Sequence, residues 1–460
     1  MNTIISQFVE KCTKNFYGAI EKIVGENGTV SDLTVSLKKD FDELGVKLVQ
    51  FALESVDNEL CNDSARKKSW SIDKKLQEKT LTTIFGDVHY QRTYFVSKFG
   101  KGYSYLCDRI FGIEPHERCD MNVKAKMIEN AIDMSYEKSS KVFESKMSKQ
   151  TVLNSIREIE NERLSIEALK QKSCVDVLYV EADEDHVALQ NGSSVMPYLA
   201  YVHEGYVDKD KSRKELKNIR YFSGMYKNSE DFWLEVANYI EENYDTDRLK
   251  TVYLAGDGAA WIKQGRHWIP KVKIVLDKYH LNKYIISATG NVPEMRSDIW
   301  RSLYKKDLKQ LKCVFDDIMI CADSPQRVEQ INKTWQYIKT NWEGIMNSYD
   351  TGYIGCSAEG HVSHILSERL SSRPLGWSYI GVNDMAKLRA FRANNGNVYE
   401  VIKRQKRDNK RNGIKKITEN VVKRVAKNIN TVYTDVKPVA LENGLKNGLY
   451  KALHAICYAI

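Results

Sequence analysis

The stretch VDVLYVEADEDHVALQ (residues 175–190) decides the fold, because an apolar strand pattern runs directly into four acidic residues within five positions. Two further segments rich in β-branched and aromatic residues follow it, PYLAYVHEGYV (197–207) and NIRYFSGMY (218–226). The connections between them are short, which is typical of antiparallel neighbours. The three segments therefore predict a three-stranded meander.

Two strand–helix units follow this meander. An amphipathic helix is expected over residues 229–244, with Ser229 as its N-cap. Then KTVYLAGDGAAWIKQG (250–265) and KVKIVLDKYHLNKYI (271–285) each predict a buried strand that leads into a helix. Right-handed crossovers place these later strands parallel to the first. The order βββαβαβα predicts an α/β fold, a ribonuclease-H-like domain with a mixed five-stranded sheet.

The rest of the chain is predicted to be mainly helical. The hairpin signal around Gly86-Asp87 lies in TLTTIFGDVHYQRTYFVSK (80–98). The predicted organisation is a helical N-terminal region (1–75), a β-hairpin with a helix-turn-helix-like DNA-binding region (76–170), a ribonuclease-H-like catalytic domain (171–290 and 353–385), an all-helical insertion (291–352) and a basic C-terminal helical region (386–460).

Composition excludes several classes of protein. The 460 residues include 42% hydrophobic residues and only 7 Pro, which argues against wholesale disorder. The 9 Cys are scattered without a CxxC pair, which argues against a disulfide framework or a zinc ribbon. The sequence shows neither a signal peptide nor an apolar run long enough to span a membrane. We expect a cytoplasmic protein with no membrane partner, associated with the nucleoid when it acts on DNA.

Positive charge is concentrated near the C-terminus. The net charge is +9, from 70 Lys and Arg against 61 Asp and Glu, but residues 387–427 alone carry 14 basic and 3 acidic residues. A dense basic strip attracts a phosphate backbone through counterion release, although a solvated helical face remains the alternative. The candidate DNA contacts in this strip are Lys403, Arg404, Lys406, Arg407, Lys410, Arg411, Lys415 and Lys416.

A second candidate DNA-binding element lies at SYEKSSKVFESKMSKQTVLNSIREI (135–159), which has the pattern of a helix-turn-helix. Ser148 is expected to cap its second helix, and Val152 and Ile156 to face the core. An ordinary pair of packed helices is the alternative. The residues that would meet DNA are Lys149, Gln150, Thr151 and Asn154.

Three acidic residues qualify as a catalytic constellation. Asp183 lies on the first strand, Asp257 follows the fourth strand, and Glu359 begins a late helix. Strand ends gather at one edge of an open α/β sheet, so these residues are expected to converge. The choices that stay open are Glu181 or Asp185 in place of Asp183, Asp277 in place of Asp257, and Glu368 in place of Glu359.

Carboxylates in this number predict divalent cations, because they repel one another unless cations neutralise them. Hard oxygen ligands suit Mg²⁺ or Mn²⁺. A pair of such ions can activate a water or a 3′-hydroxyl and stabilise the leaving oxygen of a phosphodiester. A rival interpretation uses the spacing ExHxxH, in which Glu359, His361 and His364 build a zinc site for a hydrolase.

Several of these segments together resemble the bacterial ISLre-type insertion-sequence transposases, relatives of the Mutator-like group. They include YLAGDGAAWIKQG (253–265), VLDKYHLNKY (275–284) and GCSAEGHVSHILSERLSSRPLGWS (355–378), and the resemblance covers nearly the whole chain. It implies a DDE catalytic domain with a helical insertion before its last acid. The acids fall on Asp183, Asp257 and Glu359, and Asp277 with His280 matches a [C/D]xxH motif whose His assists near the active site.

The predicted function is metal-dependent DNA strand cleavage and strand transfer of an insertion sequence by a DDE transposase. Asp183, Asp257 and Glu359 would hold two Mg²⁺ or Mn²⁺ ions, and His280 would orient a water, a phosphate or a carboxylate. The partners that the resemblance implies are terminal inverted repeats, target DNA and further copies of the chain in a homo-oligomer. The alternatives are a non-catalytic DNA-binding protein derived from a transposase and the zinc-dependent hydrolase.

Overall fold

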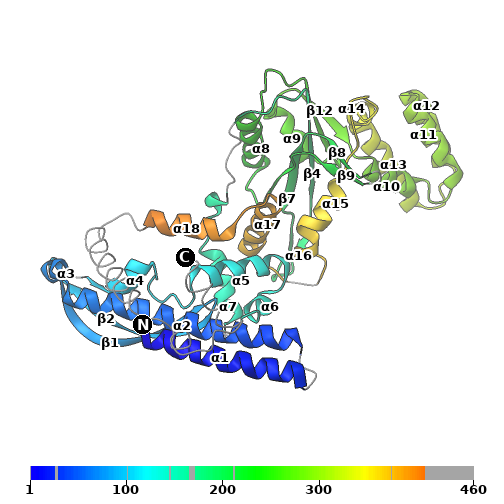
Figure 1. Cartoon of the computed structure of the whole chain (residues 1–460). Helices are drawn as coiled ribbons and strands as arrows, with labels where there is room; N and C mark the ends of the chain where they lie inside the picture. Colours follow the sequence, from blue (N-terminus) through cyan, green and yellow to red (C-terminus); the bar gives the residue numbers. More distant parts are fainter. Residues whose placement is uncertain are drawn as a thin grey trace. The chain divides into compact units, whose positions relative to one another are not determined.

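The structure, a computed structural model, describes residues 2–25, 29–100, 102–143, 147–164, 171–210, 213–373 and 376–409. It divides into two compact units (Figure 1), which are described separately. One comprises the described part of residues 1–158 together with 398–409, and the other comprises the described part of residues 159–397. The five segments predicted from the sequence are finer than these two units.

The first unit combines long N-terminal helices with a β-hairpin. Its first elements are α1 (Asn2–Gly25), α2 (Val30–Asn62), α3 (Ser64–Ser69), β1 (Trp70–Thr83), β2 (Gly86–Ser97), β3 (Tyr103–Ser104) and α4 (Leu106–Phe111). Apolar residues of α2, β2 and α4 share one core that includes Leu53, Phe95 and Leu106. The predicted hairpin is confirmed, but β1 already begins inside the region expected to be helical.

The hairpin turn also lies two residues earlier than predicted. Thr83 pairs with Gly86, so the turn residues are Ile84 and Phe85 instead of Gly86-Asp87. A Cβ on Gly45 of α2 would come within 2.5 Å of the Phe85 ring. This close approach between α2 and the turn explains why the turn lies earlier than predicted. The position of Phe85 is set by a tertiary contact, which the sequence of the turn does not show.

The first unit continues with three packed helices, α5 (Met121–Asp133), α6 (Tyr136–Ser140) and α7 (Lys149–Arg157), and receives α18 (Val398–Asn409) against α5. As predicted, Ser148 caps α7 by accepting a hydrogen bond from the Thr151 amide. Val152 and Ile156 are buried, also as predicted.

The second unit is built on a mixed five-stranded sheet in the order β10-β7-β4-β11-β12 (Figure 1). Its strands are β4 (Val177–Glu184), β7 (Tyr198–His203), β10 (Arg220–Gly224), β11 (Thr251–Gly256) and β12 (Val272–Leu276). The first three pair antiparallel, which confirms the meander. The last two lie parallel to β4 on its other side, which confirms the expected direction of the strand–helix units.

Alternation along β4 separates apolar from acidic residues. Leu178, Val180 and Ala182 belong to the main core with α8 (Ser229–Asn243). Successive side chains of a strand point to opposite faces, so Glu181 and Asp183 lie on the other face. The N-cap of α8 is Asn228, one residue before the predicted Ser229, because the Asn228 side chain accepts from the Asp231 amide.

Helices complete the second unit. After β11 comes α9 (Ala260–Gln264), and after β12 comes α10 (Lys278–Ala288). The predicted helical insertion contains α11 (Arg296–Tyr304), α12 (Leu308–Ile320), α13 (Pro325–Thr340) and α14 (Trp342–Asn347). The later helices are α15 (Ala358–Val362), a π-helical turn (Ser363–Ser367), α16 (Glu368–Leu370) and α17 (Tyr379–Ala393). Apolar residues of the insertion and of α10 form a second core, separate from the main core of the sheet.

Short elements fill the connections of the second unit. They are the 3₁₀ turns at Asn161–Arg163, Gly265–His267 and Pro293–Met295 and the small hairpins β5 (Val187–Ala188) with β6 (Ser194–Val195) and β8 (Tyr206–Asp210) with β9 (Arg213–Leu216). Within the described residues, no helix is both long enough and apolar enough to cross a membrane.

Gly256 at the end of β11 provides a test of how tightly the sheet packs beneath the predicted site. A Cβ there would lie 2.7 Å from the Ala182 carbonyl oxygen and 2.6 Å from Ile262 Cδ1. We expect Gly256→Ala to lower the free energy of unfolding by about 1–3 kcal/mol, because backbone of the neighbouring strand must move. Chemical denaturation measures this change. Gly360→Ala is the control, since nothing lies within 4 Å of its Cβ; equal losses in both variants would contradict the packing argument.

Candidate functional site

Asp183 lies one residue before the end of β4. Its side chain is buried, with 7% exposure, and one oxygen accepts a hydrogen bond from the Glu184 amide at 2.9 Å. The other two carboxylates on the same strand face have different surroundings. They show which member of the predicted trio is available for chemistry.

Glu181 is fully engaged in hydrogen bonds. It accepts from Tyr201 Oη at 2.5 Å, from His203 Nε2 at 3.0 Å and from the Ser357 amide at 2.5 Å. Burial alone would raise the pKa of Glu181, but these hydrogen bonds hold it below the usual value. Glu181 is therefore a structural carboxylate that ties β4 to the residue before α15.

Asp185 is also held within the fold. One of its oxygens accepts from Ser371 Oγ at 2.9 Å and from the His186 amide. Neither Glu181 nor Asp185 belongs to the cluster of possible metal ligands that forms in the described residues around Asp183. The geometry thus favours Asp183 among the three acids that the sequence left open.

Asp257 lies in the turn between β11 and α9. Its Oδ1 accepts from the Ala259 amide at 2.7 Å, and its carbonyl oxygen accepts from Tyr337 Oη at 2.6 Å. Gly258 has φ +87°, and a Cβ there would lie 2.5 Å from Asn341 Oδ1. The Gly-Asp-Gly sequence is therefore required both by the backbone conformation and by the approach of α13 and its following residue.

Asp277 and His280 form a hydrogen-bonded pair at the start of α10. Asp277 caps this helix by accepting from the Tyr279 amide, and its other oxygen lies 3.0 Å from His280 Nδ1. With Nδ1–H donating to Asp277, the opposite nitrogen is directed at Glu359, whose Oε2 lies 4.0 Å from it. Asp277 therefore orients His280, which is the arrangement found around histidines that bind metals.

Three of the four predicted catalytic residues come together. Ligand atoms of Asp183, His280 and Glu359 all lie within 4.8 Å of one another. Asp257 is not a member of this group, but its charge acts on both Asp183 and His280. Asp183 is buried, His280 is half-buried and the Glu359 side chain is 58% exposed, so the cluster opens to solvent on the side of α15.

The electrostatics of the cluster show uncompensated negative charge. Burial raises the pKa of Asp183 to about 7, and the charges of Asp257 and Glu184 act in the same direction against His280. The hydrogen bond to Asp277 raises the pKa of His280 above its usual value, and the nearby carboxylates add to this effect. Two carboxylates, an oriented imidazole and a third carboxylate nearby form a donor set that fits a divalent cation.

The histidines of the predicted ExHxxH zinc site do not join this cluster. His361 Nδ1 lies 2.8 Å from Tyr221 Oη, and the His361 ring packs on Tyr201 with centroids 4.3 Å apart. Burial lowers its pKa. Among the described residues, neither His361 nor His364 belongs to a group of possible metal ligands. The zinc hydrolase stays a prediction, and the positions of His361 and His364 do not support it.

The predicted DNA contacts on α7 lie at the surface. Lys149, Gln150 and Asn154 are exposed and Thr151 is partly exposed. Gln150 Nε2 donates to Asn154 Oδ1 at 2.8 Å, so these two amides form one polar surface on the first turns of the helix.

The basic residues of α18 have two different environments. Arg404 and Arg407 are exposed, whereas Lys406 Nζ donates to both carboxylate oxygens of Glu117, at 2.7 and 2.8 Å. Lys403 is paired with Glu400 at 3.0 Å. The remaining candidates, Lys410, Arg411, Lys415 and Lys416, lie outside the described residues.

Three residues that shape the site were missed from the sequence. Tyr337 and Asn341, from the helical insertion, support the Asp257 turn. Trp261 Nε1 donates to Glu184, which satisfies the acid next to Asp183. The sequence shows only that the aromatic Trp261 lies three residues after Gly258, which does not identify its partner.

Comparison with known proteins places the chain in a family. Residues 25–408 match the family described as "Uncharacterised protein family (UPF0236)". A UPF0236 protein of Caldanaerobacter subterraneus subsp. tengcongensis is 42% identical over 460 residues, which cover 99% of this chain and 98% of that protein. A second UPF0236 protein of the same organism is 42% identical and covers 97% of this chain and 96% of its own length. The chain therefore belongs to the UPF0236 family.

Both relatives are encoded at several loci of one organism. The name of the first gives eleven loci and the name of the second gives four.

The raised pKa of Asp183 predicts a pH-dependent stability. Unfolding releases its proton between about pH 4 and pH 7, so the ionised carboxylate lowers the free energy of unfolding as the pH rises through this range. In EDTA, we expect Asp183→Asn to raise the free energy of unfolding by about 1–4 kcal/mol at pH 8 and by less at pH 5. Denaturant titrations at both pH values measure the difference, with the exposed Asp323→Asn as control. A rise in the free energy of unfolding that is the same at both pH values would contradict the raised pKa of Asp183.

Proposed function

We propose that this protein is a transposase that cleaves and joins DNA strands in a metal-dependent reaction, with Asp183, Asp257 and Glu359 as its catalytic acids. The observation that carries the proposal is the convergence at the cluster. Ligand atoms of Asp183, His280 and Glu359 lie within 4.8 Å of one another, and the charge of Asp257 acts on two of them. These residues come from segments up to 176 positions apart, so local sequence does not force them together.

The sheet supports this proposal. In chain order its strands are arranged 3-2-1-4-5, with the second strand antiparallel to the first and the last two parallel to it. This order and these directions are the ones expected of the ribonuclease-H-like arrangement, which we propose for this unit. Two of the proposed acids stand at the ends of the central pair of strands, β4 and β11, where active sites of open sheets form.

The relatives provide a second, independent support. Eleven locus names for one protein in one organism are expected when a coding sequence has been copied within its genome. An insertion sequence that encodes its own transposase multiplies in this way. A housekeeping hydrolase would not need such a number of loci.

The residues of the site suit the chemistry. Asp183, Asp257 and Glu359 would hold the cations, which when bound supply Lewis acidity toward the phosphodiester. His280 is oriented by the hydrogen bond between its Nδ1 and Asp277, which leaves Nε2 on the side of Glu359, where it would orient a water, a phosphate or a carboxylate. Glu184 Oε2 accepts a hydrogen bond from Trp261 Nε1, and among the described residues Glu184 does not belong to the group of possible metal ligands.

Contacts with the DNA backbone are proposed for two exposed surfaces of the first unit. The first turns of α7 present Lys149, Gln150 and Asn154, and α18 presents Arg404 and Arg407. Arginine and lysine neutralise phosphates, and polar side chains at the start of a helix can meet base edges. The ends of the element and target DNA would be the substrates, with the chain acting as a homo-oligomer.

Asp257→Asn tests the catalytic assignment. We expect Mg²⁺-dependent cleavage of DNA from the ends flanking the coding sequence to fall on the order of a thousandfold, because the loss of one acid removes cation binding worth several kcal/mol in the transition state. Binding of the same DNA in EDTA should be unchanged. Asp176→Asn, before the opposite end of β4, is the control. Undiminished cleavage by Asp257→Asn would exclude the assignment, and absence of cleavage by the wild type with unchanged binding would favour the non-catalytic DNA-binding alternative.

The two environments on α18 predict opposite effects of neighbouring substitutions. Arg404→Gln with Arg407→Gln should reduce the salt dependence of DNA binding by about two phosphate contacts and leave stability within about 0.5 kcal/mol. Lys406→Gln should instead cost about 1–3 kcal/mol of stability, because Glu117 is buried and loses a charged donor. Binding curves at several salt concentrations and denaturant titrations measure both quantities. If Lys406→Gln alone changes the salt dependence, the surface has been assigned wrongly.

A further inference from the structure

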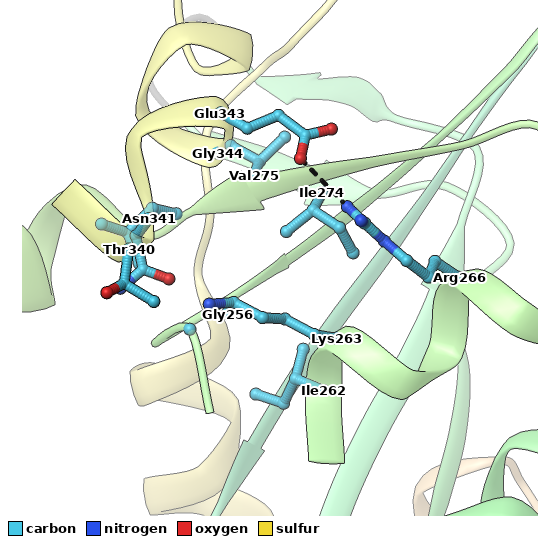
Figure 2. A pocket seen from close by; sticks show the side chains of 12 residues that line it. Gly256, Ile262, Lys263, Arg266, Ile274, Val275, Thr340, Asn341, Glu343 and Gly344 are labelled. Atoms are coloured by element: carbon cyan, nitrogen blue, oxygen red, sulfur yellow. Dashed lines mark hydrogen bonds and ion pairs between the residues drawn. The ribbon is translucent and has the colours of Figure 1, made fainter. Parts of the chain in front are cut away.

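A cavity of about 120 Å³ adjoins the turn that carries Asp257 (Figure 2). Gly256 and Gly258 form one side of it, and Thr340, Asn341 and Glu343 form the other. Its floor is made of Ile262, Ile274 and Leu276. Its volume is well below the roughly 300–1,000 Å³ of sites for drug-sized ligands, so it suits a small group.

Lys263 contributes a cation to this cavity. Figure 2 shows its side chain extending from α9 across the pocket toward the side formed by Thr340 and Asn341. Within the part of the chain that the structure describes, its ammonium has no hydrogen-bond or ion-pair partner. Burial and the charge of Arg266 lower the pKa of Lys263, and the charges of Asp257 and Glu343 offset only part of this effect. A half-buried ammonium in this setting gains stability when an anion joins it.

The other polar groups at the mouth match an anion. Arg266 Nη2 lies 3.3 Å from Glu343 Oε2, so the one acid among the lining residues is already paired, and Lys263 together with Arg266 leaves the lining with a net positive charge. The exposed Thr340 hydroxyl adds a donor at the rim. Apolar residues beneath them lower the local dielectric constant, which strengthens the attraction between an ammonium and an oxyanion.

We propose that this cavity, which we name the Lys263 pocket, binds one phosphate group. The location favours the DNA backbone as its source, because a strand that presents a phosphodiester to Asp257 must pass the turn that forms the pocket wall. This choice of source rests on the proposed function, whereas binding of a phosphate by the pocket does not. Lys263 would position the strand next to the acids without contacting the reacting atoms.

The first experiment uses inorganic phosphate and requires neither DNA nor activity. At matched ionic strength in EDTA, phosphate in place of chloride should raise the melting temperature of the full-length protein by about 2 °C, as expected for a weak ligand near saturation. Lys263→Gln should lose this response and Lys263→Arg should retain most of it. Lys305→Gln, an exposed lysine after α11, is the matched control and should respond like the wild type. An undiminished phosphate response in Lys263→Gln overturns the proposal.

The second experiment identifies the source of the phosphate. In metal-free buffer, DNA containing one neutral methylphosphonate linkage at each position in turn should show one position where wild-type affinity falls several-fold and Lys263→Gln affinity does not. The salt dependence of DNA binding should also decrease by about one phosphate contact in Lys263→Gln and not in Lys305→Gln. These results would assign the pocket to the DNA backbone.

The outcomes separate this proposal from the proposed function. A phosphate response that depends on Lys263, without any such position in DNA, supports the pocket as a site for free phosphate and weakens the transposase proposal. Both responses in a protein that never cleaves DNA support the pocket and argue against catalysis. The phosphate response of Lys263→Gln therefore decides the pocket, and cleavage by Asp257→Asn decides the reaction.

Discussion

The rest of the structure depends on how the fold accommodates several carboxylates at one edge of a sheet. Three of them accept hydrogen bonds from different partners. Glu181 accepts from Tyr201, His203 and Ser357, Glu184 accepts from Trp261, and Asp277 pairs with His280. Burial raises the pKa of Asp183 to about 7, although the hydrogen bond from the Glu184 amide and the charge of His280 act in the opposite direction. Burial raises the pKa of the neighbouring Glu184 as well, so negative charge gathers at this end of β4, beside His280 and Glu359, where a cation would be attracted.

The same hydrogen bonds also place the last acid. Glu181 and Asp183 stand on one face of β4, and the Ser357 amide that donates to Glu181 directly precedes α15, which carries Glu359. A structural carboxylate and a candidate catalytic one are thus two residues apart on a single strand. The first fixes the chain that brings Glu359 to the second, so the burial of Glu181 stabilises the geometry of the site and not only the fold.

Much of this could be predicted from the sequence, and the failures have physical causes. Strand alternation and short connections were sufficient for the meander and for the two parallel strands, because these are local signals. The choice of Asp183 over Glu181 was not accessible, since the three acids share one strand face and differ only in partners from distant segments. The hairpin turn lies earlier than predicted because Phe85 packs against Gly45, and the sequence does not report that Lys406 pairs with Glu117. The turn was therefore misplaced because of a tertiary contact, whereas the N-cap of α8 was missed by one residue because Asn and Ser are both good caps.

The helical insertion is part of the site and not an appendage to it. Tyr337 holds the Asp257 carbonyl, and Asn341 packs against Gly258, so the end of α13 fixes the turn that carries this acid. Thr340 and Asn341 are also a wall of the Lys263 pocket. A group that enters the pocket and pushes on this wall acts on the residues that orient Asp257. The same helix end therefore lines the pocket and supports the turn that carries Asp257.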